Sequence, residues 1–375
     1  MKRFGWRTKA TALLGSLCLA LGLAACGGGN DSQPHSSNSP KQASGPISVV
    51  ASINQWGSLA REIGGSDVKV TSIVNTVSVD AHDFEPQTTD MAKLQGAEIV
   101  VVNGAGYDNW ASKSVAKGTT SVSAATAVGA STGDNPHLWF SKDARTAMAT
   151  ELEDAFAKAR PAKAKRFQAR LKTWKASETK LEGTMKAFSQ KHKDATYGAT
   201  EPVAYYLMDD LGFTDKTPKG YTQAVGSEGE PAPSDLQKFQ HLISGRDVNL
   251  LINNTQEASN TTNLLTGTAG RTEVPVVDVS EQMPENQTTL TGWITALTKN
   301  IDKAMTDFKD SEAGHEKVSP GNTGSDDNDS GQPSQSGQPS QAGQSGNATN
   351  SDQQTPAAPG NGSAPSNAGQ TDPGK

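Results

Sequence analysis

The chain has 375 residues, with 34 Lys and Arg against 40 Asp and Glu, and only two cysteines. This length allows two domains at the usual ~100–200 residues each. The formal net charge of -6 lacks the basic footprint of a nucleic-acid-binding protein, so we expect no nucleic-acid partner. Two cysteines also exclude a disulfide framework and a site of four cysteines around a metal.

Residues 1–25 predict a lipoprotein signal peptide. Basic residues at the start precede an apolar stretch over 10–25, which is shorter than the ~20 residues that span a bilayer. The stretch ends in Leu23-Ala24-Ala25-Cys26, which resembles a bacterial lipobox. We therefore expect cleavage before Cys26, lipidation of this cysteine, and an extracytoplasmic protein anchored to the cell membrane by its lipid. The alternative is a plain secretory signal followed by a chance cysteine.

Two polar segments flank the part of the chain that can form a core. Residues 26–45 are rich in Gly, Ser, Pro and Asn and predict a flexible tether. Residues 313–375 become almost entirely Gly, Ser, Gln, Asn, Pro, Asp, Thr and Ala from about Ser319 onward, which predicts a disordered tail. The tail's role is open.

Between these segments, short runs rich in Val and Ile alternate with helical patterns, which favours βαβ units and parallel sheets. The expected strands are 47–53, 68–74, 98–103, 195–199, 248–253 and 274–278. The expected helices include 56–63, 88–94, 203–211, 234–244 and 290–308. The sequence thus predicts an α/β fold of two Rossmann-like parallel-sheet lobes, at residues 46–160 and 192–312.

Residues 161–191 predict one long helix that joins the two lobes. Apolar residues recur there at helical spacing, and Pro161 suits a first helical turn. A helix of this length would extend over roughly 43 Å, about the length of a lobe. The alternative is a shorter helix with ordinary loops between the lobes.

The six histidines differ in their settings. His35 and His315 lie in polar segments, His192 lies between two lysines and is expected in solvent, and His241 lies on an amphipathic helix. His82 and His137 instead lie in loops after strand-like segments, close to aromatic residues and prolines. Such loops converge at the carboxyl ends of parallel strands, where two histidines and two further ligands could bind a divalent ion.

At these residues the chain resembles the solute-binding lipoproteins of ABC importers for zinc and manganese, the cluster A-I metal-binding proteins. The resemblance runs from about Ile47 to Phe308. It rests on VDAHDFEP around His82, NGAGYDNW at 103–110, DNPHLWF around His137, and the long helix. It implies a metal site in the cleft between the lobes, with two ligands from each lobe.

The resemblance implies four ligands, namely His82, His137, Glu201 and Asp278. Glu201 follows the first strand of the second lobe, where the family has a His or Glu, although Pro202 after it departs from the usual pattern. Asp278 stands at the end of a late strand, where the family has an Asp. Alternatives for these last two places are Glu228, Glu230 and Glu281. Glu201 could otherwise be a carboxylate at a helix N-terminus, and Asp278 a turn residue.

The ligand set favours Mn²⁺ as the transported ion, with Zn²⁺ as the second possibility. Two imidazoles and two carboxylates are harder than three imidazoles and one carboxylate. Zn²⁺ nevertheless binds most such sites more tightly than Mn²⁺, so affinity alone does not identify the ion. Residues 83–133 contain no histidine, whereas many zinc carriers of this family have a His-rich loop after the first motif.

The function that these features favour is capture of a divalent transition metal and its delivery to an ABC permease. The expected partners are the transmembrane subunits of the permease and the membrane itself, and we expect a monomer. One alternative is a surface adhesin or interaction lipoprotein, which the acidic body and polar tail would suit. Another is a metal-dependent hydrolase, but no HExxH motif occurs, and we expect no enzyme activity.

The lipobox yields a first prediction. Cys26→Ala should move the protein from the membrane fraction to the medium or periplasm, because each buried CH₂ of the acyl chains contributes ~0.8 kcal/mol to membrane attachment. Cell fractionation with an antibody against the chain measures this. Cys18→Ala is the matched control, because Cys18 lies in the removed segment. Unchanged membrane attachment of the Cys26 variant would contradict lipidation.

Overall fold

The computed structural model of the chain describes residues 45–79 and 84–316, with side chains to residue 309. The predicted signal, Cys26 and the rest of the tether up to residue 44, His82, and the chain beyond residue 316 lie outside the described residues.

The N-terminal lobe is a parallel sheet of four strands in the order β2-β1-β3-β4. Its strands are β1 (Ile47–Ile53), β2 (Val68–Val74), β3 (Ile99–Val102) and β4 (Thr120–Ser123). Its helices are α1 (Asn54–Gly64), α2 (Thr88–Gln95), α3 (Asn109–Ser112), α4 (Ala124–Val128) and α5 (Lys142–Ala159). The first two strands have the bounds that the sequence predicted, whereas β4 and α5 were not predicted.

The C-terminal lobe repeats this plan with a parallel sheet in the order β6-β5-β7-β8. Its strands are β5 (Thr196–Ala199), β6 (Thr214–Asp215), β7 (Leu251–Asn254) and β8 (Val276–Val279). Its helices are α7 (Tyr205–Asp210), α8 (Lys219–Val225), α9 (Pro233–Ser244), α10 (Asn260–Arg271) and α11 (Leu290–Glu316). Single 3₁₀ turns stand at η1 (Gly65–Asp67), η2 (Leu138–Phe140), η3 (Pro161–Lys163) and η4 (Pro202–Ala204).

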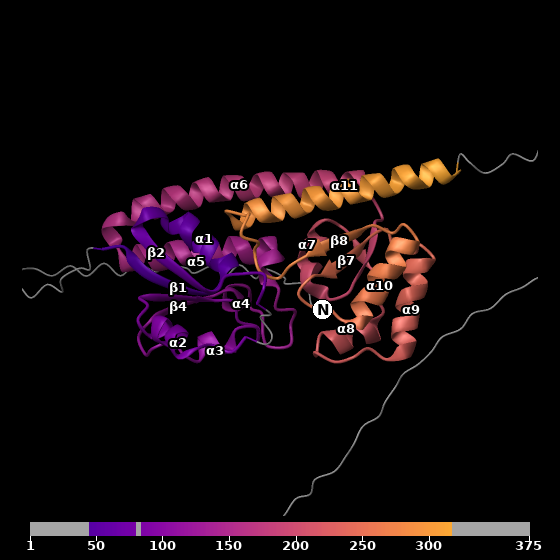
Figure 1. Cartoon of the computed structure of the whole chain (residues 1–375). Coiled ribbons are helices and arrows are strands. Elements are labelled where there is room, and N and C mark those ends of the chain that lie inside the picture. The colour runs from indigo at the N-terminus through magenta and orange to yellow at the C-terminus, as the bar shows by residue number, and fades with distance from the viewer. Residues whose placement is uncertain (1–44, 80–83, 317–375) are drawn as a thin grey trace, which may run out of the picture. The chain divides into compact units, whose positions relative to one another are not determined.

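The two lobes are joined by α6 (Ala164–Lys191), a helix of 28 residues that follows the turn η3. Figure 1 shows α6 passing along both lobes, with α11 beside it. The fold predicted from the sequence, two parallel-sheet lobes joined by one long helix, is confirmed.

The main hydrophobic core is continuous between the lobes. In the N-terminal sheet, alternate side chains point to opposite faces, so Val49 and Ala51 join the main cluster while Val50 joins a smaller one. The main cluster continues through Trp174 of α6 and Trp293 of α11 to the C-terminal lobe. A separate cluster fills the other face of the C-terminal sheet. Because close-packed side chains resist displacement, this shared core fixes the two sheets relative to each other beneath α6 and α11.

His192, at the end of α6, departs from the sequence expectation of a solvated residue. Its side chain is buried, its ring packs on Phe188, and its Nε2 atom lies 2.7 Å from a carboxylate oxygen of Asp302 on α11. Burial lowers the pKa of His192 despite that carboxylate. The two lysines beside it in the sequence indicated an exposed residue, but α11, which comes from a distant part of the chain, covers it.

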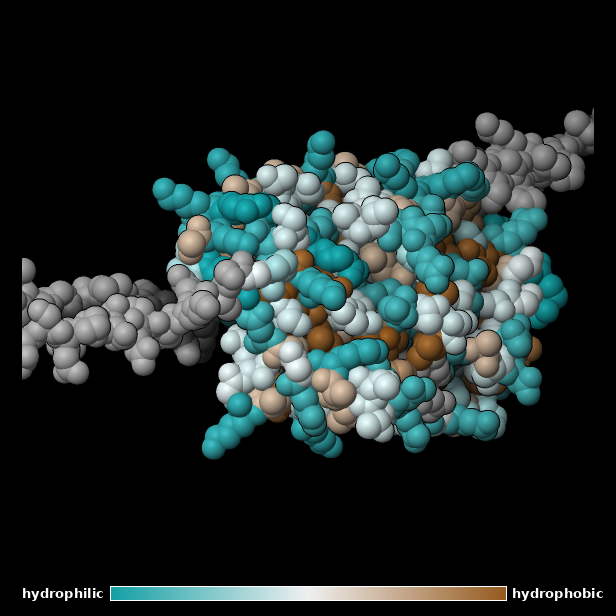
Figure 2. Space-filling model, turned by 60° about the vertical axis from the view of Figure 1, so that its left-hand side comes forward, coloured by the Kyte–Doolittle hydropathy of each residue, from teal (hydrophilic) through white to brown (hydrophobic). Residues whose placement is uncertain are grey.

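The face of the body in Figure 2 is mostly hydrophilic or near neutral, with hydrophobic residues showing as small scattered patches. Val77 and Leu264 are the large hydrophobic residues that the described part of the chain exposes, at 38% and 40%. None of the helices in residues 45–79 and 84–316 combines the length and the apolar character needed to cross a membrane.

A buried ion pair connects α5 and α6 to the turn η2. The Arg145 guanidinium donates hydrogen bonds to Glu178 Oε1, at 2.9 Å from Nε, and to the carbonyls of Trp139 and Phe140, at 3.2 and 3.0 Å. Thr291 of α11 donates to the other oxygen of Glu178. Removing one member of a buried pair typically costs about 3–5 kcal/mol, since it leaves an uncompensated charge. The pair therefore fixes the turn that directly follows His137.

Glu62, on α1, lies at the junction with α6 and α11. Burial raises its pKa from 4.5 to about 7, although a backbone hydrogen bond at Leu290 opposes the shift and the carboxylate of Glu178 adds to it. Its buried Oε1 atom has no hydrogen-bond partner among the described residues. A carboxyl group with a higher pKa in the folded chain binds its proton more tightly there, so it stabilises the fold at low pH. That stabilisation is lost as the pH rises from about 4.5 to about 7.

Glu62→Gln should therefore raise the melting temperature above that of the wild type at pH ~8 and leave it unchanged near pH ~4.5, because the amide resembles the protonated acid. Calorimetry at both pH values measures this. Glu182→Gln, an exposed glutamate of α6, is the control and should change neither value. A Glu62 variant that melts at or below the wild-type temperature at pH ~8 would contradict the pKa shift.

Candidate metal centre

The carboxyl ends of the central strands provide the frame of the site. In each sheet the first and third strands in chain order lie side by side, and the strand order reverses between them. Such a switch point opens a crevice at the carboxyl ends of the strands. Asn54 and Asn103 follow β1 and β3 in one lobe. Glu201 follows β5 by two residues, and Asn254 is the last residue of β7 in the other lobe. Polar side chains from both sheets are thus gathered at the boundary between the lobes.

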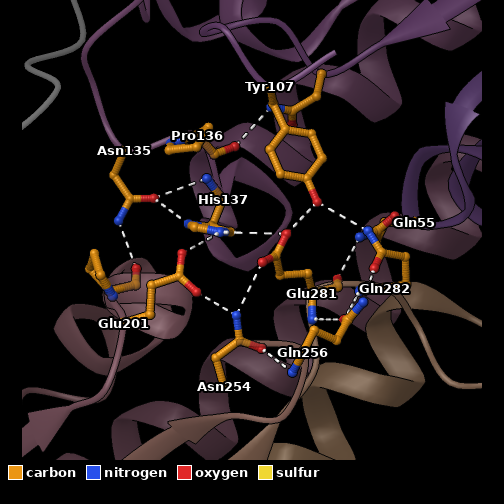
Figure 3. Close-up of polar contacts among 12 residues, drawn as sticks. Gln55, Tyr107, Asn135, Pro136, His137, Glu201, Asn254, Gln256, Glu281 and Gln282 are labelled. Carbon is orange, nitrogen blue, oxygen red and sulfur yellow. Dashed lines mark hydrogen bonds and ion pairs between the residues drawn. The ribbon is translucent and has the colours of Figure 1, made fainter. Parts of the chain in front are cut away.

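Three side chains at this boundary form a group that could hold a metal ion. His137, Glu201 and Glu281 each offer a ligand atom, and these atoms all lie within 4.8 Å of one another. His137 Nε2 lies 3.6 Å from Glu201 Oε1 and 3.9 Å from Glu281 Oε2 (Figure 3). The three residues are 2%, 7% and 1% exposed. An imidazole and two carboxylates, buried together, form a donor set suited to a divalent cation.

The orientation of His137 is set by Asn135. The Oδ1 atom of Asn135 lies 2.9 Å from both the backbone nitrogen and the Nδ1 atom of His137. Since an amide oxygen only accepts, Nδ1 must be the protonated nitrogen. The lone pair is then on Nε2, which faces the two carboxylates, as a metal-ligating histidine requires.

Asn135 also connects the two lobes beside the site. Its Nδ2 atom donates to the carbonyl of Pro202 at 2.7 Å, one residue after Glu201, and its own carbonyl accepts from the hydroxyl of Tyr206. On the other side, Asn103 donates to the carbonyl of Pro136 at 2.8 Å. The loop that carries His137 is thus attached to both lobes.

Tyr107 orients Glu281. Its hydroxyl donates to Glu281 Oε2 at 2.5 Å and accepts from Gln282 at 3.0 Å. Burial, together with the neighbouring Glu281 carboxylate, raises the pKa of Tyr107 well above its ordinary value, so the hydroxyl keeps its proton. Gly104, three residues before Tyr107, has φ +78°, and a Cβ at this position would lie 2.7 Å from the Cβ atom of Ala125. Only glycine fits at position 104 of this turn, which brings Tyr107 to the site.

The backbone of Glu281 is held as firmly as its side chain. Gln55 of α1 donates to the carbonyl of Glu281 at 2.6 Å, and Gln256 accepts from its N–H at 2.7 Å. Gln256 also donates to the carbonyl of Val79 in the N-terminal lobe at 2.7 Å. Glu281 is therefore fixed from both lobes.

A cavity of about 940 Å³ opens beside the group. His137 and Glu201 line it, and so do Glu228 and Glu230. Those last two glutamates, alternatives in the sequence analysis, are exposed and lie outside the group of ligand atoms. The cavity gives a small hydrated ion a route to the buried side chains.

The structure brings together His137 and Glu201 of the sequence-predicted ligands, but it does not bring Asp278 to them. Asp278 lies within β8, is exposed, and accepts a hydrogen bond from Asn253 on the neighbouring strand. The strand continues through Val279, and the acidic residue that reaches the site is Glu281, which the sequence left as an alternative. His82 lies outside the described residues, so its role stays a prediction.

Residues 49–304 match the family described as zinc-uptake complex component A, periplasmic (ZnuA), and the chain belongs to this family. This confirms the resemblance found in the sequence. By its description, the family forms a component of a zinc-uptake complex. Its members are solute-binding proteins rather than enzymes.

Individual relatives agree with this membership. The manganese-binding lipoprotein MntA of Bacillus subtilis is 26% identical over 221 residues, which cover 56% of this chain and 71% of that protein. The zinc-binding protein AdcA of Streptococcus pyogenes is 22% identical over 232 residues, 54% of this chain and 44% of AdcA, so the chain spans less than half of that relative.

The periplasmic zinc-binding protein TroA of Treponema pallidum has the same fold. Its structure superposes with a TM-score of 0.60 at 18% identity, covering 70% of this chain and 99% of TroA.

The position of Glu281 leads to a prediction. Glu281→Gln should weaken divalent metal binding at least as much as the roughly 10–100-fold loss seen when an outer-shell partner is removed, because it neutralises a ligand carboxylate. Asp278→Asn is the matched control, since it removes the same charge outside the group, and it should leave affinity unchanged. Titration calorimetry measures both. The reverse order of effects would restore Asp278 as the ligand.

Proposed function

We propose that this protein captures a divalent transition metal ion, Mn²⁺ or Zn²⁺, between its two lobes and delivers it to the permease of an ABC importer. The observation that carries the proposal is the buried group of His137, Glu201 and Glu281, contributed by both lobes. Membership of a metal-uptake family supports it, as do relatives named for manganese and zinc binding.

We include His82 as a further ligand on the strength of the sequence motif. The described residue Val79, three positions before it, accepts a hydrogen bond from Gln256, which in turn binds the backbone of Glu281. This contact connects the end of the described segment before His82 to the residue that binds the backbone of Glu281, which supports the proposal. The proposed set is then His82, His137, Glu201 and Glu281.

This donor set favours Mn²⁺ more than a set with three imidazoles would, because carboxylate oxygens suit the harder ion. Zn²⁺ still competes through its higher intrinsic affinity, so supply in the cell contributes to the choice. Elemental analysis of protein isolated from cells grown with defined amounts of both ions identifies the ion that is carried.

The cellular setting completes the proposal. A lipid on Cys26 keeps the monomeric protein at the outer side of the cell membrane, within reach of the transmembrane subunits of the permease. Solute-binding proteins of this family work with such permeases, and MntA is itself named a lipoprotein.

The test is metal binding by the mature chain after treatment with a chelator. At a metal concentration of about 100 Kd, binding adds roughly 2.7 kcal/mol to stability, which corresponds to a rise in melting temperature of about 5–10 °C. His137→Ala should abolish most of this rise and also abolish uptake of radioactive manganese in cells. His241→Ala is the control, because His241 is an exposed histidine of α9 that lies outside the group of ligand atoms.

A wild-type chain that binds neither ion would refute the proposed function. A chain that binds metal while His137→Ala cells take up manganese normally would refute delivery through this site.

A further inference from the structure

Asn254 connects the two ligand carboxylates. Its Nδ2 atom carries two hydrogens, and it donates to Oε2 of Glu201 and to Oε1 of Glu281, the latter at 3.1 Å (Figure 3). The other oxygens, Oε1 of Glu201 and Oε2 of Glu281, are those that lie 3.6 and 3.9 Å from His137 Nε2. The amide thus divides the four carboxylate oxygens into two that it binds and two that face the imidazole, and the facing oxygen of Glu281 also accepts from the hydroxyl of Tyr107 at 2.5 Å.

The amide of Asn254 is itself fixed in this orientation. Its Oδ1 atom accepts from the backbone N–H of Gln256 at 3.0 Å, and its backbone N–H donates to the hydroxyl of Thr200 at 3.0 Å. A rotation that exchanged oxygen and nitrogen would point the oxygen at two carboxylates and lose every one of the side chain's hydrogen bonds. Asn254 is also 1% exposed, so water does not replace these partners readily.

We propose that Asn254 is a specificity-determining residue that restricts Glu201 and Glu281 to binding the captured ion through one oxygen each. This inference rests on the proposed function. Binding the ion with both oxygens would draw the oxygen that accepts from the amide toward the ion, which weakens this hydrogen bond in a buried site where an unmatched donor is costly.

One-oxygen binding affects the choice between the two ions. Zn²⁺ prefers four ligands in a tetrahedral arrangement, whereas Mn²⁺ suits larger sets of oxygen ligands. By limiting the number of carboxylate oxygens that bind the ion, Asn254 reduces the preference for Mn²⁺ that the two carboxylates provide. Asn254, which does not itself bind the ion, thus affects the choice between Mn²⁺ and Zn²⁺.

The test compares Asn254→Leu with Asn253→Leu. Leucine has the same branching and the same number of side-chain heavy atoms as asparagine but donates no hydrogen bond, so the first variant releases both carboxylates. Asn253 is the adjacent residue on the same strand and binds Asp278 instead, outside the site. Competition titrations give Kd for Mn²⁺ and for Zn²⁺, and the Asn254 variant should shift their ratio toward Mn²⁺ by about tenfold or more. The Asn253 variant should leave the ratio unchanged.

X-ray absorption of the wild-type protein loaded with Mn²⁺ tests the same point without a variant. Carboxylates bound through one oxygen support the inference, and a carboxylate bound through two overturns it, even if the leucine variant fails to fold. An unchanged ratio of affinities in a folded Asn254 variant also overturns it. Either of these two overturning results would leave the proposed function intact. A wild-type protein that bound neither ion would instead refute the proposed function itself.

Discussion

Glu201 and Glu281 carry two acidic groups into a part of the molecule that is almost closed to water, at 7% and 1% exposure. Moving an ionised carboxylate out of water is costly unless hydrogen bonds or an opposite charge replace the hydration. Asn254 and Tyr107 supply hydrogen bonds, but both are neutral donors and cancel no charge. The arrangement therefore orients the carboxylates while preserving their attraction for a cation. The loops, the lobes and their shared core all serve to keep these groups in place.

The strands β1 and β3 could be predicted because they are short runs rich in Val and Ile, buried on both faces. The elements that the sequence analysis missed lack this signal. The strand β4 has the sequence TSVS and is partly exposed, and β6 consists of only Thr214 and Asp215. Both are edge strands, which pack against one neighbour and need fewer apolar residues. They pair because of the strands beside them, and a local pattern does not contain that information.

The sequence predicted those parts of the site that lie in loops after strands. Glu201 follows β5, His137 follows β4 and the short helix α4, and the structure brings the two side chains together. Asp278 was selected because its strand was expected to end there, one residue early. Side chains alternate between the faces of a strand, so such an error selects the wrong face. The same error hid Asn254, the last residue of β7, because that strand was expected to end at 253. Strand ends depend on pairing across the sheet, which a single sequence does not display.

Glu281 belongs to the C-terminal lobe by sequence, yet the N-terminal lobe also holds the backbone of its segment. Gln55 binds its carbonyl, and Asn54 exchanges two hydrogen bonds with Met283, at 2.7 and 3.1 Å. Gln256 binds it from the C-terminal side. Asn54, Gln55 and Met283 are buried and Gln256 is half-buried, so breaking either set of bonds leaves polar groups without their partners in a place that water reaches poorly. A separation of the lobes would therefore break hydrogen bonds on one side or the other of the segment 281–283, so the position of Glu281 depends on both lobes together.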